Sequence, residues 1–300
     1  MALTSEAKCA APTGDKCGEG IAWCPEENAV YWTDINRFLI HRFDPVTRDV
    51  RSWMFDEPAT TVMLTDRDGT FAVTLGSRVI LWKPSDDSRR DLGFQLPGWP
   101  AVRLNDAGVD PRGAMWVGSM QNNVNPDGSE GPLDQSTGAL YRIEPDGSGT
   151  QFQDRIGVSN TFVWSPDRER FYFGDTFQNA IWAHDFNENT GDIGKPGPFF
   201  SGFTRGLPDG SAIDEQGYVW NCRWDGACVV RVAPDGNVDH VVEIPARNIT
   251  NCTFGGKDMN ILYVTSAASA DPGDRLAGSL FAVETEVRGL PDGRFKLPRG

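Results

Sequence analysis

The sequence predicts an all-β fold, a six-bladed β-propeller, and three observations lead to this prediction. A short segment recurs six times, every 41 to 55 residues: a polar residue, four mostly small or apolar residues, a turn and a strand. Each unit supplies three clear strands and room for a fourth, which is the composition of a propeller blade. The 33 glycines and 20 prolines are spread along 300 residues without a long apolar-periodic helix. We therefore expect a single propeller domain over residues 1–300.

The first strand of each unit is short and apolar on both faces. This pattern suits the innermost strand of a blade, which is covered by the neighbouring blades and lines the central channel. Its first residue is polar and would point into the channel mouth. The six inner strands are expected to start near Glu19, Thr60, Asn105, Asn160, Asp209 and Thr250.

Composition excludes several classes of partner. A hydrophobic content of 39%, with 10 Trp and 17 Phe, is ample for a large core. The formal net charge of -14 argues against nucleic acid or an anionic membrane as a partner. The first eight residues lack the apolar run of a signal peptide, and no segment is long and apolar enough to span a bilayer. The sequence therefore predicts a cytoplasmic protein that binds neither nucleic acid nor membrane, and it leaves the oligomeric state open.

The six cysteines do not form a disulfide framework in a chain of this length, and none has the spacing of a zinc site. Cys222 and Cys228 flank a short turn and could face each other across a hairpin. A disulfide between them is one interpretation, although a cytoplasmic location makes it less favourable.

One long loop interrupts the third unit. Residues 121–137 carry no strand pattern and lie between the second and third strands of that unit. Long loops in compact domains are usually functional or disordered. Because this loop lies at the same end of the blade as the polar positions, it could be a lid or pocket wall, or a plain surface insertion.

Four of the six polar positions carry a carboxylate or a carboxamide. Any one of them could be an ordinary loop residue or a cap of buried backbone, but their shared position in the repeat favours a common site. Their oxygen atoms are ligands for a hard divalent cation such as Ca²⁺, Mg²⁺ or Mn²⁺. Zn²⁺ stays open, although its sites more often use His or Cys. Arg103 lies two residues before Asn105, so both leave the same face of an extended segment, and Arg103 could donate to substrate oxygens.

Several motifs together resemble the regucalcin/gluconolactonase family of sugar lactonases. The resemblance extends in the same order from about Gly18 to Val283. The motifs are Gly18-Glu-Gly20, Arg103-Leu-Asn-Asp106, Asp110-Pro-x-Gly113, Gly138-Ala-Leu-Tyr141, Ser159-Asn160, Pro208-Asp-Gly210 and Thr253-Phe-Gly-Gly256. The resemblance implies a six-bladed propeller with one divalent metal at the channel, and hydrolysis of a sugar lactone to its aldonic acid.

The resemblance also implies roles for individual residues. Glu19, Asn160 and Asp209 would bind the metal, and Asp209 would in addition accept a proton from the attacking water. Arg103 and Asn105 would contact the substrate, a small sugar lactone.

Three positions depart from the family pattern. Thr161 stands where the family usually has glycine, and Cys17 where it usually has an aliphatic residue. Asn123 is the expected equivalent of a Glu with which some relatives bind substrate, so which sugar is bound stays open. Two alternatives also stay open at this point: a metal-dependent hydrolase of phosphotriesters, and a calcium-binding propeller without catalytic activity.

Overall fold

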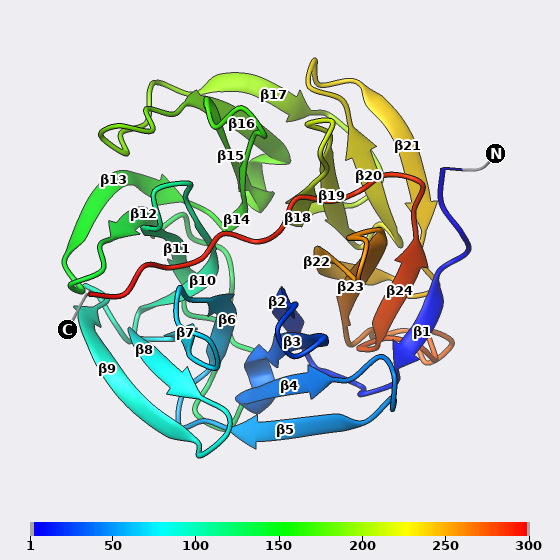
Figure 1. Ribbon diagram of the computed structural model, residues 1–300, viewed down its shortest axis with the longest axis horizontal. Coiled ribbons are helices and arrows are strands. Elements are labelled where there is room, and N and C mark those ends of the chain that lie inside the picture. Colours follow the sequence, from blue (N-terminus) through cyan, green and yellow to red (C-terminus); the bar gives the residue numbers. More distant parts are fainter. Residues whose placement is uncertain (1–2, 299–300) are drawn as a thin grey trace.

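A computed structural model describes residues 3–298 of the protein, so residues 1–2 and 299–300 of the predicted domain lie outside the described part. Six four-stranded antiparallel sheets stand in a ring around a central channel (Figure 1). In five of them the chain runs strand by strand from the channel to the rim. The predicted six-bladed propeller is confirmed, and every blade has a fourth strand.

The strands occupy equivalent places in each blade. The inner strands are β2 (Gly18–Cys24), β6 (Ala59–Leu64), β10 (Val102–Val109), β14 (Ser159–Trp164), β18 (Leu207–Ile213) and β22 (Asn248–Gly255). The second strands are β3 (Ala29–Asp34), β7 (Phe71–Leu75), β11 (Met115–Gln121), β15 (Arg170–Asp175), β19 (Val219–Trp224) and β23 (Ile261–Ala267). The third strands are β4 (Leu39–Phe43), β8 (Arg78–Lys83), β12 (Gly138–Ile143), β16 (Ala180–Asp185), β20 (Cys228–Val232) and β24 (Leu280–Glu284). The outer strands are β5 (Val50–Met54), β9 (Ser88–Gln95), β13 (Gly149–Ile156), β17 (Gly197–Ser201), β21 (Val238–Glu243) and β1 (Lys8–Ala11).

The ring is closed by the start of the chain. Strand β1 is the outer strand of the last blade and pairs antiparallel with β24, with Lys8 opposite Ala282. The first and last parts of the chain therefore share one sheet, which joins the first blade to the sixth (Figure 1).

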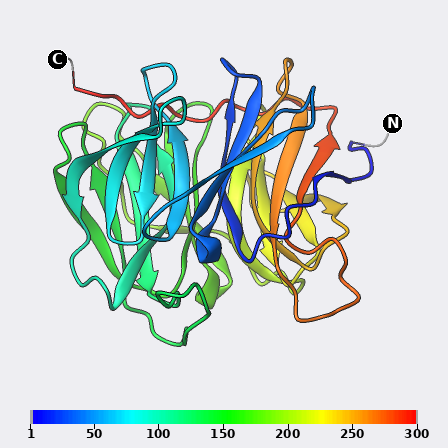
Figure 2. The same cartoon turned by 90° about the horizontal axis from the view of Figure 1, so that it is seen from below.

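A second closure crosses one end of the channel. Residues 286–298, which we call the C-terminal strap, run across this end, while the loops after β11 and β23 lie at the opposite end (Figure 2). Backbone N–H groups of the strap donate to inner-strand carbonyls, from Leu290 to Ile213 and from Phe295 to Leu64, both at 2.9 Å. Phe295 is fully buried. The strap therefore ties the fifth blade to the second across the channel.

Buried tryptophans pack between the blades, and their polar edges are satisfied. A buried indole N–H needs an acceptor, because leaving it unpaired costs free energy. Each of four fully buried tryptophans donates from Nε1 to an aspartate: Trp32 to Asp15, Trp82 to Asp87, Trp116 to Asp110 and Trp220 to Asp214.

The suggested disulfide between Cys222 and Cys228 is wrong. The hairpin register places Cys228 opposite Arg223, and Cys222 opposite Val229, so the two thiols do not face each other. The six cysteines, which all lie within residues 3–298, are free. Within these residues we also find no helix that is long and apolar enough to cross a membrane.

Candidate functional site

Every inner strand carries a β-bulge at the polar position of the repeat. The pairing with the second strand slips at Glu19/Ala22, Ala59/Thr61, Leu104/Ala107, Asn160/Phe162, Pro208/Ser211 and Ile249/Cys252. A bulge leaves an extra residue unpaired and re-aims the side chains beside it. Two consecutive residues of one strand can therefore reach the channel, where regular alternation would send one of them to the opposite face.

Three buried carboxyl groups meet in the channel as a result. Glu19, Asp106 and Asp209 are each less than 8% exposed. Asn251 connects two of them, because its Nδ2 donates to Glu19 Oε2 at 3.1 Å and to Asp106 Oδ1 at 3.3 Å. Asp106 and Asn251 were not predicted as site residues. Each directly follows a predicted polar position, and the bulge brings it into the channel.

A bound cation would stabilise the ionised forms of these three carboxyl groups, because their surroundings disfavour negative charge. Burial raises the pKa of Asp209 well above its ordinary value, and the negative charges of Glu19 and Asp106 raise it further. Burial and the charge of Glu19 raise the pKa of Asp106 to about 8. Burial also raises the pKa of Glu19, against the opposing effect of hydrogen bonds from Asn251 and Gly20.

Gly20 follows Glu19 and Gly210 follows Asp209, and these two glycines allow the inner strands to approach each other. A Cβ atom on Gly210 would lie 2.1 Å from the carboxamide carbon of Asn251, and one on Gly20 would lie 2.4 Å from the carbonyl oxygen of Thr60. Gly20 also has a φ of +50°, which side chains disfavour. The Glu-Gly and Asp-Gly pairs seen in the sequence therefore set how closely the carboxyl groups converge.

A chain of hydrogen bonds links the predicted substrate residues to Asn160. Arg103 donates from Nη1 to Asn105 Oδ1 at 2.7 Å, and from Nε and Nη2 to Asn123 Oδ1 at 3.0 and 2.9 Å. Asn105 donates from Nδ2 to the carbonyl oxygen of Ser159 at 2.8 Å and to Asn160 Oδ1 at 3.3 Å. Burial lowers the pKa of Arg103 to about 10, so it stays protonated at neutral pH.

The donor set fits a single hard divalent cation. With all three carboxyls ionised, as a bound cation would favour, they and the guanidinium of Arg103 would carry a formal charge of -2, which one divalent ion would balance. Glu19, Asp209 and Asn160 Oδ1 offer oxygen atoms, as Ca²⁺, Mg²⁺ and Mn²⁺ prefer. Burial and the charge of Glu19 raise the pKa of the nearby Cys17 thiol well above its ordinary value.

A family model described as the SMP-30/Gluconolactonase/LRE-like region matches residues 17–268. The chain belongs to this family. It is 33% identical to the pentonolactonase XacC of Haloferax volcanii, over 96% of this chain and 97% of the relative. It is 30% identical to the 6-deoxy-6-sulfogluconolactonase of Pseudomonas putida, over 96% and 98% of the two chains. A crystal structure of a calcium-binding protein, regucalcin, from Agrobacterium tumefaciens has the same fold, with a TM-score of 0.90 at 24% identity, covering 99% of this chain and 100% of that one.

The residue beside Asn160 in this SMP-30/gluconolactonase family member has an unusual backbone conformation. Thr161 adopts a φ of +60°, in the left-handed region that a β-branched residue rarely occupies. Its hydroxyl donates to the carbonyl oxygen of Asp209 at 2.7 Å, which holds the fourth blade to the fifth.

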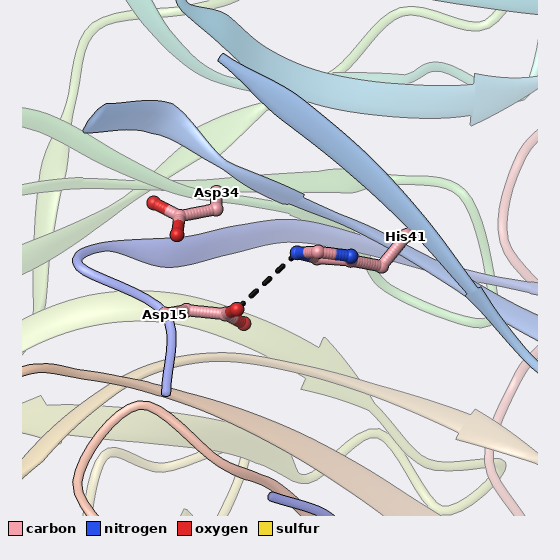
Figure 3. Close-up of side chains that lie close together, drawn as sticks. All are labelled: Asp15, Asp34 and His41. Atoms are coloured by element: carbon pink, nitrogen blue, oxygen red, sulfur yellow. Dashed lines mark ion pairs between the residues drawn. The ribbon is translucent and has the colours of Figure 1, made fainter. Parts of the chain in front are cut away.

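A second acidic cluster is buried in the first blade, where Asp15 lies beside Asp34 of β3 and His41 of β4 (Figure 3). Ligand atoms of Asp15, Asp34 and His41 lie within 4.8 Å of one another, so their spacing alone would suit a metal. Arg37 already pairs with both aspartates, and Trp32 donates to Asp15 at 2.7 Å. Asp34 also accepts the backbone N–H groups of residues 16 and 17, at 3.0 and 3.1 Å. We assign this cluster a structural role, in fixing the loop that leads to Glu19.

Proposed function

We propose that the protein hydrolyses a sugar lactone to the corresponding aldonic acid with the help of one divalent cation. The observation that carries this proposal is the buried group of Glu19, Asp106 and Asp209 carboxyls near the guanidinium of Arg103, from which hydrogen bonds lead through Asn105 to Asn160 Oδ1. The names of two relatives at 33% and 30% identity, a pentonolactonase and a sulfogluconolactonase, support the same substrate class.

Glu19, Asp209 and Asn160 Oδ1 would hold the cation. Bound there, it would polarise the lactone carbonyl and acidify a nearby water, effects typically worth several kcal/mol of transition-state stabilisation.

Asp209 would act as the general base. The oxygen of a water forms a bond to the carbonyl carbon while the Asp209 carboxylate accepts the proton that the water loses. The ring C–O bond then breaks, and this proton passes to the departing ring oxygen, which becomes a hydroxyl. A bound cation would lower the pKa of Asp209, whereas burial and the neighbouring charges raise it. Because the cation would also acidify the water, a weakly basic carboxylate would suffice.

Arg103, Asn105 and Asn123 would orient the substrate. Asn123 Oδ1 accepts two hydrogen bonds from Arg103, so its Nδ2 is the atom that would donate to a ring hydroxyl. Arg103 keeps an N–H group on Nη2 beyond these contacts, which would donate to the carbonyl oxygen. Asn105 fixes the guanidinium through its Oδ1.

The test is metal analysis of the purified protein, followed by proton release from a panel of aldonolactones. Protein dialysed against a chelator should lose turnover and regain it with one or more of Ca²⁺, Mg²⁺, Mn²⁺ and Zn²⁺. Turnover of phosphotriesters without lactones would favour the alternative hydrolase. Unfolding on ion removal, without turnover of either substrate class, would favour a calcium-binding propeller without catalysis.

A further inference from the structure

We infer that Thr176 is a positioning residue of the cation site, which fixes the orientation of the Asn160 carboxamide and holds the peptide group before Asp209. This inference rests on the proposed function, because it assumes that Asn160 Oδ1 binds a cation.

Thr176 lies between the two predicted ligands. Asn160 Nδ2 donates to Thr176 Oγ1 at 2.8 Å, and Thr176 Oγ1 donates to the carbonyl oxygen of Pro208 at 2.8 Å. A hydroxyl has one proton, and a carbonyl can only accept. The proton of Thr176 therefore points to Pro208, so Oγ1 can only accept from Asn160.

The other side of Asn160 imposes the same orientation. The guanidinium of Arg103 can only donate, so Asn105 must present Oδ1 to it and Nδ2 to Asn160. A flipped Asn160 would place two N–H groups against each other on this side and two acceptor oxygens against each other on the Thr176 side. The two ends of a carboxamide have nearly the same shape, so packing alone does not choose between them. These hydrogen bonds leave Oδ1 as the atom available to a cation.

The first blade shows that the turn itself does not require this hydroxyl. Thr176 opens the 3₁₀ helix η2 (Thr176–Gln178) after Asp175, which caps it by accepting the N–H of Phe177. The equivalent helix η1 (Ile35–Arg37) also follows a capping aspartate, Asp34, which accepts the N–H of Arg37, and it also ends in a left-handed residue, Phe38. Its first residue is Ile35, which is apolar and buried. The hydroxyl of Thr176 is therefore a feature of the site and not of the turn.

The experiment compares Ca²⁺ and Mn²⁺ affinities by isothermal titration for the wild-type protein, Thr176→Val and Thr176→Ser. Valine keeps the shape of threonine but removes both hydrogen bonds. We expect Thr176→Val to weaken both affinities by about 10- to 100-fold, as is usual for groups that orient metal ligands. Serine keeps the hydroxyl and should restore the affinity to within about threefold of the wild type.

Thr65→Val is the matched control. Thr65 is buried, and its hydroxyl donates to the carbonyl oxygen of Thr70 at 2.7 Å, next to the strap at the opposite end of the channel. Its loss should lower the melting temperature but leave the affinities unchanged. Equal affinity losses in both valine variants would overturn the inference, as would wild-type affinity in Thr176→Val or a failure of serine to restore binding.

The same titrations separate this inference from the proposed function. A wild-type protein that binds Ca²⁺ but hydrolyses no lactone would refute the proposed function, while the affinity ratios would still decide the role of Thr176. A wild-type protein that binds neither Ca²⁺ nor Mn²⁺ would refute both.

Discussion

Replacing Asp209 with asparagine should stabilise the cation-free protein while abolishing its activity. The substitution keeps the shape of the side chain and an oxygen that can accept the N–H of Gly210, a contact of 3.1 Å in the structure. It removes a carboxylate whose pKa is raised by burial and by the charges of Glu19 and Asp106. An ionised group in such a place costs about 1.4 kcal/mol of folding free energy for each unit by which its pKa is raised.

The effect on catalysis has the opposite sign. Loss of a general base typically lowers the rate by about 10²- to 10⁴-fold, which corresponds to about 3–5 kcal/mol in the activation free energy. Loss of one of two ligand carboxylates should also weaken Ca²⁺ binding, so part of the deficit should be recovered at high Ca²⁺ and the remainder should persist.

Two measurements check this prediction. In chelator, Asp209→Asn should have a higher melting temperature than the wild type. In excess Ca²⁺ the difference between the two melting temperatures should become smaller or change sign. Proton release from a lactone should fall by at least about a hundredfold at saturating Ca²⁺. A variant that is less stable than the wild type in chelator, or that retains turnover within about tenfold, would refute the reasoning.

Two predictions concern the strap end of the channel. Burial raises the pKa of Asp292 to about 6, so the folded state binds this proton more tightly than the unfolded state, and stability should fall by up to about 3 kcal/mol as pH rises from about 4 to 6. Asp292→Asn should not lose stability in this way, and it should keep lactone turnover. If the free energy of unfolding, measured in urea, changes equally with pH in the wild type and in Asp292→Asn, the raised pKa of Asp292 is contradicted. Phe295→Ala removes a fully buried ring and should cost about 3–5 kcal/mol in the free energy of unfolding, measured by urea titration. Its Ca²⁺ affinity should stay unchanged because the strap lies at the other end of the channel, and a weakened affinity would show that the two ends are coupled.

The repeat made the fold predictable, because each blade is a local unit with its own strands and turns. The closures of the ring were not predictable in the same way. Strand β1 pairs with β24, where Lys8 lies opposite Ala282, and the strap pairs with Thr65 of the second blade through Phe295 and with Asp214 of the fifth through Gly289. These partners lie far away in the sequence, and no local pattern predicts them. The disulfide error has a related cause, since the hairpin register that separates Cys222 from Cys228 depends on the length of the turn.

The same limit applies to the site. The repeat singled out Glu19 and Asp209, which the structure brings together, because both stand at the first polar position of an inner strand. Asp106 and Asn251 were not predicted as site residues, because strict alternation along a strand places them on the face away from the channel. Only the bulges turn them inward, and a bulge depends on how two strands pair.

One of the bulges places a strained backbone conformation next to the candidate site. Thr161 is the bulged residue of β14, and its left-handed conformation costs about 1–3 kcal/mol for a residue of this kind. The same conformation brings its hydroxyl to the carbonyl oxygen of Asp209 and within 2.9 Å of Ser211 Oγ. Thr176 holds the preceding carbonyl, that of Pro208. The hydroxyls of Thr161 and Thr176, both in the fourth blade, therefore hydrogen-bond to the carbonyl groups of Asp209 and Pro208, on either side of the Asp209 side chain. A glycine at position 161 would relieve the strain but lose the hydrogen bond to the carbonyl oxygen of Asp209, so the strained threonine exchanges stability of the strand for a fixed position of Asp209.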